Sequence, residues 1–126
     1  ERRIVGETTL ERSSDGHFYA TAMVNGQETR FLVDTGASIV ALTAPDAQAL
    51  GLEWSDSDIV PIGRGASGDV SGVPVVLDEI ELEGIAVRNI NAAIVPEGLD
   101  VSLLGQTFLS QVETLDVSKD RMTLAD

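Results

Sequence analysis

The chain contains no cysteine and only one histidine, His17, among its 126 residues. Without cysteine it has neither disulfides nor a thiolate nucleophile, so the sequence leaves the redox compartment open. A structural zinc site is disfavoured, because Zn²⁺ takes Cys and His ligands. A Ser-His-Asp triad would have to use His17, and the chain has no G-x-S-x-G nucleophile elbow. We therefore expect neither a metal nor a cofactor.

Basic residues and long apolar runs are also scarce. Eight Lys and Arg stand against 21 Asp and Glu, for a formal net charge of −13. Nucleic acid and anionic membranes both select clustered basic residues, so neither is expected as a partner. No segment approaches the roughly 20 apolar residues of a membrane-spanning helix, and we expect no signal peptide within residues 1–126. Because the chain begins at Glu1, we expect it to be a piece of a longer protein, with the targeting segment outside it.

The chain has the length of a single domain, and its apolar residues follow the pattern of strands. Its length and its hydrophobic fraction of 43% suit one domain, residues 1–126. Most apolar residues alternate or form short runs, as in strands, and Asn25-Gly26 and Glu83-Gly84 are typical hairpin turns. Two short helices are predicted, over residues 44–51 and 105–112. The sequence therefore predicts an all-β fold.

The stretch "FLVDTGASIVAL", residues 31–42, places an acid, Asp34, at the end of a buried strand. A turn aspartate is the simplest interpretation. A weak internal repeat argues for chemistry instead: residues 18–51 and 75–112 each follow the order hairpin, strand, Gly-containing turn and helix. The repeat aligns residues 31–38 with 101–108, and only its first copy has an aspartate at the strand end. Packing alone does not explain that difference.

These residues resemble the retropepsin-like aspartic proteases, in particular the bacterial single-domain type. The resemblance covers most of the chain, through "GHFYATAMVNGQETRFLVDTGAS", "AQALGL" and "LLGQTFLSQVETLDVSKDRMTL". It implies a closed β-barrel of short antiparallel strands with one or two short helices and a flap hairpin. It also implies an aspartic endopeptidase, in which two carboxylates share one proton, activate a water and protonate the leaving amine. Because the chain has one Asp-Thr-Gly, the implied enzyme is a homodimer with Asp34 of each copy at the two-fold axis.

The resemblance gives the neighbours of Asp34 supporting roles. The hydroxyl of Thr35 would cross the dimer axis and bond the partner's backbone. Gly36 would let its backbone approach the carboxylate, where a Cβ would intrude, and its N–H would donate to Asp34. Ala37 lacks the hydroxyl that pepsin-like enzymes usually carry there, so we expect a less acidic optimum, roughly pH 4–6.5.

A glycine-rich stretch, residues 63–72, falls where the family has its flap, which closes over the substrate and excludes water. Backbone groups at its tip would bind an extended peptide. The expected substrate-binding residues are Ser38, Gly65, Ala66, Ser67 and Gly68.

The sequence departs from the retroviral pattern at Gln106 and Ser38. Retroviral members usually have an Arg and an acid at these positions, and the two form an ion pair. That pair is impossible here, although a Gln–Ser hydrogen bond is possible. The implied dimer is then weaker, or held by other strands such as those of residues 1–12, and it depends on protein concentration.

Two alternatives remain open. The chain could be a non-catalytic module that binds an extended peptide by strand addition. It could also be a self-processing domain that cleaves only its parent chain. The substrate cannot be read from the motif. The resemblance to bacterial members implies a periplasmic location, or a membrane anchor with the domain facing the periplasm.

Overall fold

The computed structural model describes residues 6–65 and 68–126, and strands make up most of them. The strands are β1 (Glu7–Glu11), β2 (Tyr19–Val24), β3 (Gln27–Val33), β4 (Val40–Thr43), β5 (Val60–Gly65), β6 (Gly68–Leu82), β7 (Ile85–Val95), β8 (Ser102–Leu104), β9 (Thr114–Val117) and β10 (Arg121–Ala125). The helices are α1 (Ala44–Ala49), the 3₁₀ helix η1 (Asp56–Asp58) and α2 (Gln106–Leu109).

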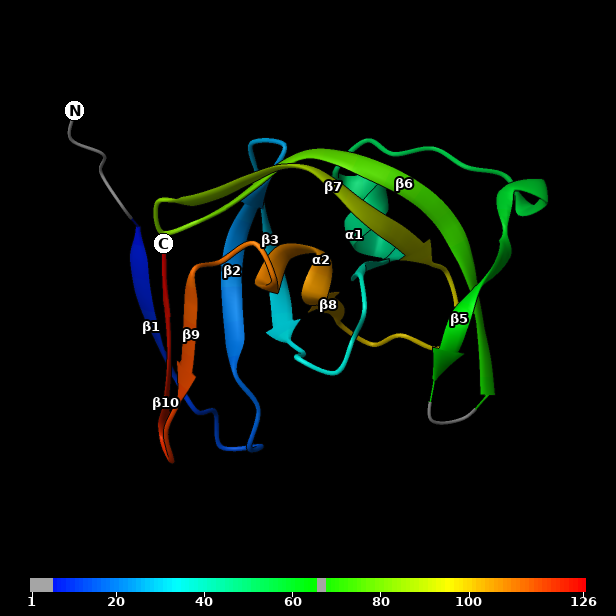
Figure 1. Ribbon diagram of the computed structural model, residues 1–126. Helices are drawn as coiled ribbons and strands as arrows, with labels where there is room; N and C mark the ends of the chain where they lie inside the picture. Colours follow the sequence, from blue (N-terminus) through cyan, green and yellow to red (C-terminus); the bar gives the residue numbers. More distant parts are fainter. Residues whose placement is uncertain (1–5, 66–67) are drawn as a thin grey trace.

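The main sheet has the strand order β2-β3-β8-β4-β7-β6-β5, and a further pairing of β2 with β6 closes six of these strands into a barrel (Figure 1). The predicted all-β barrel is confirmed. Two pairings are parallel, β3 with β8 and β4 with β7, and the other strand pairs of this sheet are antiparallel. Strand β8 therefore lies between β3 and β4, which are consecutive in the sequence. The loop that joins β3 to β4 carries Asp34 and passes the end of β8.

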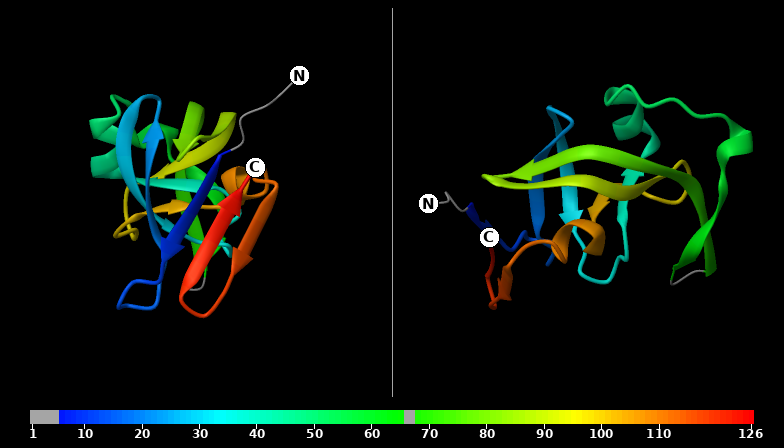
Figure 2. Two further views of the ribbon diagram at one scale, coloured as in Figure 1. Left: turned by 90° about the vertical axis from the view of Figure 1, so that its left-hand side faces the viewer. Right: turned by 45° about the horizontal axis from the view of Figure 1, so that its top comes forward.

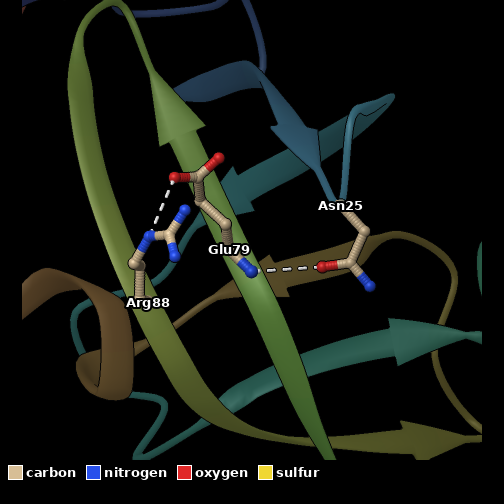
Figure 3. A network of polar contacts seen from close by, with 3 residues as sticks. All are labelled: Asn25, Glu79 and Arg88. Carbon is tan, nitrogen blue, oxygen red and sulfur yellow. Dashed lines mark hydrogen bonds and ion pairs between the residues drawn. The ribbon is translucent and has the colours of Figure 1, made fainter.

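The closure of the barrel depends on polar contacts of the β2–β3 turn (Figure 3). Asn25 donates its backbone N–H to the carbonyl of Glu79 (2.9 Å), and its side-chain oxygen accepts the N–H of Glu79 (3.1 Å). The Glu79 carboxylate also lies 3.5 Å from Nε of Arg88 on β7. Asn25 and Gly26 have φ of 49° and 85°, as expected of the predicted Asn-Gly turn. The turn that ends the first hairpin thus attaches it to the second.

The barrel encloses one core. Strand β2 alternates between buried and more exposed side chains, as the period-two pattern predicts. Helix α2 contributes Phe108 and Leu109 to this core, both buried. Full burial of a side chain of this size contributes about 1.5–3 kcal/mol, so packing holds a helix too short to be stable alone. The largest fully buried side chains include Phe31, Leu42, Leu77, Ile80, Leu82, Ile85, Ile90, Ile94, Leu104, Phe108 and Leu124.

A second, three-stranded sheet gathers the two ends of the described chain. Its order is β1-β10-β9, and Figure 2 shows the three strands side by side on one flank of the barrel. Gly6 packs against the β6–β7 turn: a Cβ added there would lie 2.5 Å from the carbonyl carbon of Gly84. Within the segment 1–12, proposed from sequence as an interface strand, residues 7–11 pair with β10 of the same chain. Within the described part of this sheet, the outer edges of β1 and β9 have no neighbouring strand.

Both predicted helices are present. The first begins as expected, with the hydroxyl of Thr43 accepting the N–H of Asp46 (3.2 Å), and Gly51 follows it at φ +81°. The second is shorter than predicted, and single turns continue it to Val112. Neither helix has the length and apolar character that a membrane crossing requires, as judged over the described residues.

The internal repeat is present, but its alignment differs from the prediction. The two copies are β2-β3-β4-α1 and β6-β7-β8-α2. Strand β3 corresponds to β7, so Asp34 aligns with Pro96 and Thr43 with Gly105, without a gap. The sequence pattern had placed Leu104 opposite Asp34. That prediction was wrong. It matched the loop after β3 to the segment that joins β8 to α2, whereas the corresponding loop is the one after β7.

Candidate active site

Asp34 lies directly beyond the end of β3 and is half-buried. Its N–H donates to the carbonyl of Leu104 (3.1 Å), which extends the parallel β3–β8 pairing by one residue. Its carbonyl accepts the N–H of Ala37 (3.1 Å), so residues 34–37 form a tight turn. The strand therefore fixes the direction of the backbone at Asp34, and the turn fixes the path of the next three residues.

The carboxylate of Asp34 is oriented by Gly36, whose N–H donates to Oδ1 (2.9 Å), as predicted. The predicted steric role of Gly36 is weaker. An added Cβ would meet Oδ1 at 3.4 Å, an ordinary contact, and Gly36 is not among the residues with a left-handed φ. Within one protomer, the function of Gly36 therefore rests on its N–H. The side chain of Thr35 is exposed, and its predicted bond to a partner's backbone stays a prediction.

Hydrogen bonds from the segment after β8 hold the Asp34 loop in place. Gln106 donates its N–H to the carbonyl of Ala37 and its side-chain Nε2 to the carbonyl of Thr35, both at 2.9 Å. The side-chain amide thus bonds the carbonyl of Thr35, not the hydroxyl of Ser38 that the sequence suggested. Ser38 and Gln106 both line a separate polar hollow of about 360 Å³. Gln106 takes an intrachain role, because the loop presents a backbone acceptor within its reach.

Thr107 and Gly105 also hold the segment after β8 close to the Asp34 loop. Thr107 accepts the N–H of Val40 with its hydroxyl (3.0 Å) and donates to the carbonyl of Asn91 (2.8 Å). Gly105 leaves no room for a side chain, because an added Cβ would lie 2.2 Å from the carbonyl oxygen of Ile39. The loop and the segment 104–107 are therefore in direct backbone contact at Asp34 and again at Ala37 and Ile39.

A groove of about 880 Å³ opens in front of the carboxylate. Its floor includes Asp34, Gly36, Ala37 and Ser38, so the structure brings these four predicted residues together. Its walls come from the β5–β6 hairpin and from residues 95–99 at the end of β7 and after it. Apolar residues dominate: Ile39, Ala41, Ile59, Ile62, Val70, Val95, Pro96, Leu99 and Leu103 line it.

The predicted hairpin tip is described only in part. Gly65 and Gly68 pair with each other as the last residues of β5 and the first of β6. Ala66 and Ser67 lie outside the described residues. Closer to the base of the hairpin, Ile62, Gly63, Asp69, Val70 and Ser71 line the groove.

Comparison with known proteins identifies the family. The model of the family described as "gag-polyprotein putative aspartyl protease" matches residues 20–111. A crystal structure of a retropepsin-like aspartic protease from Rickettsia conorii is 34% identical, with a TM-score of 0.81 over 97% of this chain and 91% of that one. The chain belongs to the retropepsin-like aspartic proteases.

Other relatives of this retropepsin-like chain agree with the assignment. EIAV protease, in complex with the inhibitor HBY-793, has the same fold at 20% identity, with a TM-score of 0.62 over 79% of this chain and 90% of that one. Among curated proteins, an uncharacterized Sinorhizobium protein in the cobV 5′ region is 41% identical over 95% of this chain, and the uncharacterized Rickettsia prowazekii protein RP867 is 38% identical over 95%. The chain spans about half the length of these two relatives, 52% of each.

Sequence reasoning missed one wall of this retropepsin-like groove. Pro96, Glu97, Gly98 and Leu99 line it, and none was proposed as a site residue. The signal was the repeat: these four residues align with the Asp34 loop once the copies are matched by β3 and β7.

Among the described residues, Asp15 and Tyr19 have shifted pKa values, and neither of them lines the groove. The hydroxyl of Tyr19 donates to Asp15 (2.6 Å), which lowers the pKa of that carboxyl and raises the pKa of Tyr19. His17 contributes a backbone N–H to Asp15 (2.9 Å) and does not line the groove. Over the described residues, no three His, Cys, Asp or Glu side chains gather as metal ligands.

Proposed function

We propose that the chain is an aspartic endopeptidase that acts as a homodimer, with one Asp34 from each copy at the two-fold axis. The observation that carries the proposal is the Asp34 carboxylate, held by the N–H of Gly36 on the floor of a peptide-sized groove. The internal repeat does not supply a second one, because Pro96 stands where the other copy has Asp34. Two copies of the chain would bring the two carboxylates together.

In the proposed reaction, one Asp34 is ionised and its partner is protonated. The ionised carboxylate takes a proton from a water on the axis, and the water oxygen bonds to the peptide carbonyl carbon. The protonated carboxyl gives its proton to the carbonyl oxygen, which yields a neutral tetrahedral intermediate. The carboxyl that took the proton of the water then gives it to the leaving nitrogen, and the C–N bond breaks. The other carboxylate takes a proton from a hydroxyl of the intermediate, so the pair again holds one proton.

The surrounding residues support this chemistry. The N–H of Gly36 would hold an ionised Asp34 in place, and Gln106 and Thr107 would keep both loops rigid at the axis. We assign the β5–β6 hairpin the role of a flap whose backbone, including Gly65 and Gly68, contacts the substrate strand. Ala66 and Ser67 stay predictions of the sequence, and Ser38 would contact the substrate from the floor of the groove.

The pH dependence of the proposed activity follows from Ala37, which is half-buried on the floor of the groove. Because it has no hydroxyl to donate to Asp34, we propose an optimum at roughly pH 4–6.5. A pH–rate profile that peaks below pH 3 would contradict this. We also propose that the parent protein places this domain in the periplasm, which fractionation of the full-length protein would test.

The test compares wild type with Asp34→Asn on an unfolded protein substrate across pH 3–7, with and without a statine-type transition-state analogue. The matched control is Asp100→Asn, which removes an exposed carboxylate that does not line the groove. We expect wild type and the control to cut, the analogue to inhibit both, and Asp34→Asn to be inactive. Sedimentation must show the dimer at the concentration used.

Other results would favour the alternatives. Equal cutting by wild type and Asp34→Asn would mean that another group, or a contaminant, is responsible. No cutting of any added substrate by a proven dimer, with cleavage of the full-length parent alone, would indicate a self-processing domain. Peptide binding without any cleavage would indicate a binding module.

A further inference from the structure

The groove carries a carboxylate that the proposed reaction does not use. Glu97 lies in its wall and is exposed, and within residues 6–65 and 68–126 it makes no hydrogen bond or ion pair. Asp69 also lines the groove but has an interaction of its own. No Lys, Arg or His stands among the described lining residues. Glu97 is thus an available anion in the groove that also holds Asp34, and the described lining residues offer it no cation.

The residues on both sides of Glu97 restrict the path of the backbone. Val95 is buried at the end of β7, Pro96 fixes its own φ, and Gly98 turns the chain at φ +88°. Pro96 and Leu99 are half-buried and line the same groove on either side of Glu97. The carboxylate therefore stands at the edge of an apolar wall.

A side chain that matches both features has an apolar stem and a cationic end. Lys and Arg place their methylenes along apolar surface while the charged group reaches water or a carboxylate. Arg in addition forms two parallel hydrogen bonds to one carboxylate. We propose that Glu97 is a specificity-determining residue, which selects peptides with Arg or Lys near the scissile bond. This rests on the proposed function, in that the groove must hold a peptide.

We expect the Glu97 contact to lower the KM of basic peptides by a small factor that depends on salt. An exposed ion pair changes binding by about two- to fivefold at low salt, and salt weakens it. Because the contact is the same in the bound substrate and in the transition state, it should appear in KM with kcat little changed. In a dimer each copy supplies one Glu97, so basic residues on either side of the scissile bond should be favoured.

The experiment uses peptide pairs that differ only in Arg or its neutral analogue citrulline, placed at successive positions around one cleavable bond. We expect wild type to favour Arg at one or more positions by about two- to fivefold in KM, with the ratio shrinking at high salt. The preference should vanish in Glu97→Gln and persist in the control Glu113→Gln, which removes an exposed charge outside the groove. A ratio unchanged in Glu97→Gln, or no preference at any position, would overturn the proposal.

A binding measurement separates this inference from the proposed function. The Asp34→Asn variant, with or without Glu97→Gln, is titrated into fluorescent Arg and citrulline peptides, and anisotropy gives the Kd ratio. If no peptide is cut by wild type, the proposed function fails, while an Arg preference lost with Glu97→Gln still supports the inference. If peptides are cut but both Kd ratios equal one, only the inference fails.

Discussion

Replacing Gly105 with alanine should break the contact that fixes the Asp34 loop. The new Cβ would lie 2.2 Å from the carbonyl oxygen of Ile39 and 2.8 Å from that of Ala37. Both neighbours are backbone, so the two segments must separate by about 1 Å to reach ordinary contact distances. Overpacking a tight interior costs about 1–3 kcal/mol. The two hydrogen bonds of Gln106 to the loop, each worth about 1 kcal/mol, would weaken as well.

We therefore expect Gly105→Ala to lower the free energy of unfolding by about 1–5 kcal/mol, the upper end being a large part of the stability of a domain of this size. Urea unfolding followed by the fluorescence of Trp54, the single tryptophan, which packs against the core, would measure it. The matched control is Gly63→Ala, where an added Cβ meets nothing within 4 Å. An unchanged urea midpoint for Gly105→Ala would refute the reasoning, because the close approach would then not be required.

Two further variants test other contacts. Gln106→Glu should lose the bond to the carbonyl of Thr35 and lower kcat more than it raises KM in the cleavage assay, whereas Gln111→Glu, an exposed change near the same helix, should leave both unchanged. Equal effects of the two would contradict a positioning role. Tyr19→Phe should raise the pKa of Asp15 toward its ordinary value, as read by NMR titration, because the Tyr19 hydroxyl is the largest cause of the lowering, while the N–H of His17 still lowers it. Because the folded-state pKa of Asp15 is lowered, its stabilisation is present above the ordinary aspartate pKa and is lost as pH falls, and it should be smaller in the variant.

Local features of the fold could be predicted from the sequence because they depend on neighbouring residues. The Asn25-Gly26 turn needs two left-handed residues and has them, and Thr43 caps the first helix as its side chain predicts. Strand order could not be predicted this way. The placement of β8 between β3 and β4 depends on contacts between distant segments, and no short pattern encodes it.

In the candidate site, too, features of neighbouring residues could be predicted, and contacts between distant segments could not. The motif itself indicated Asp34 and its loop, because strand, turn and acid are contiguous. The wall at Glu97 was missed because the repeat was aligned by its "LLG" stretch, although "VPEG" matches "VDTG" at both its valine and its glycine. The partner of Gln106 was missed because a backbone carbonyl as acceptor leaves no trace in the pattern of side chains.

The most direct test of the shared site mixes two kinds of subunit. Wild type is mixed with increasing amounts of Asp34→Asn and refolded together, and peptide cleavage is measured at a fixed total concentration at which the dimer forms. If each active site needs Asp34 from both copies, mixed dimers are inactive, and an equal mixture retains about a quarter of the activity of wild type alone. Activity that falls only to one half, in proportion to the wild-type fraction, would show that one chain cuts without its partner's carboxylate and would contradict the shared site.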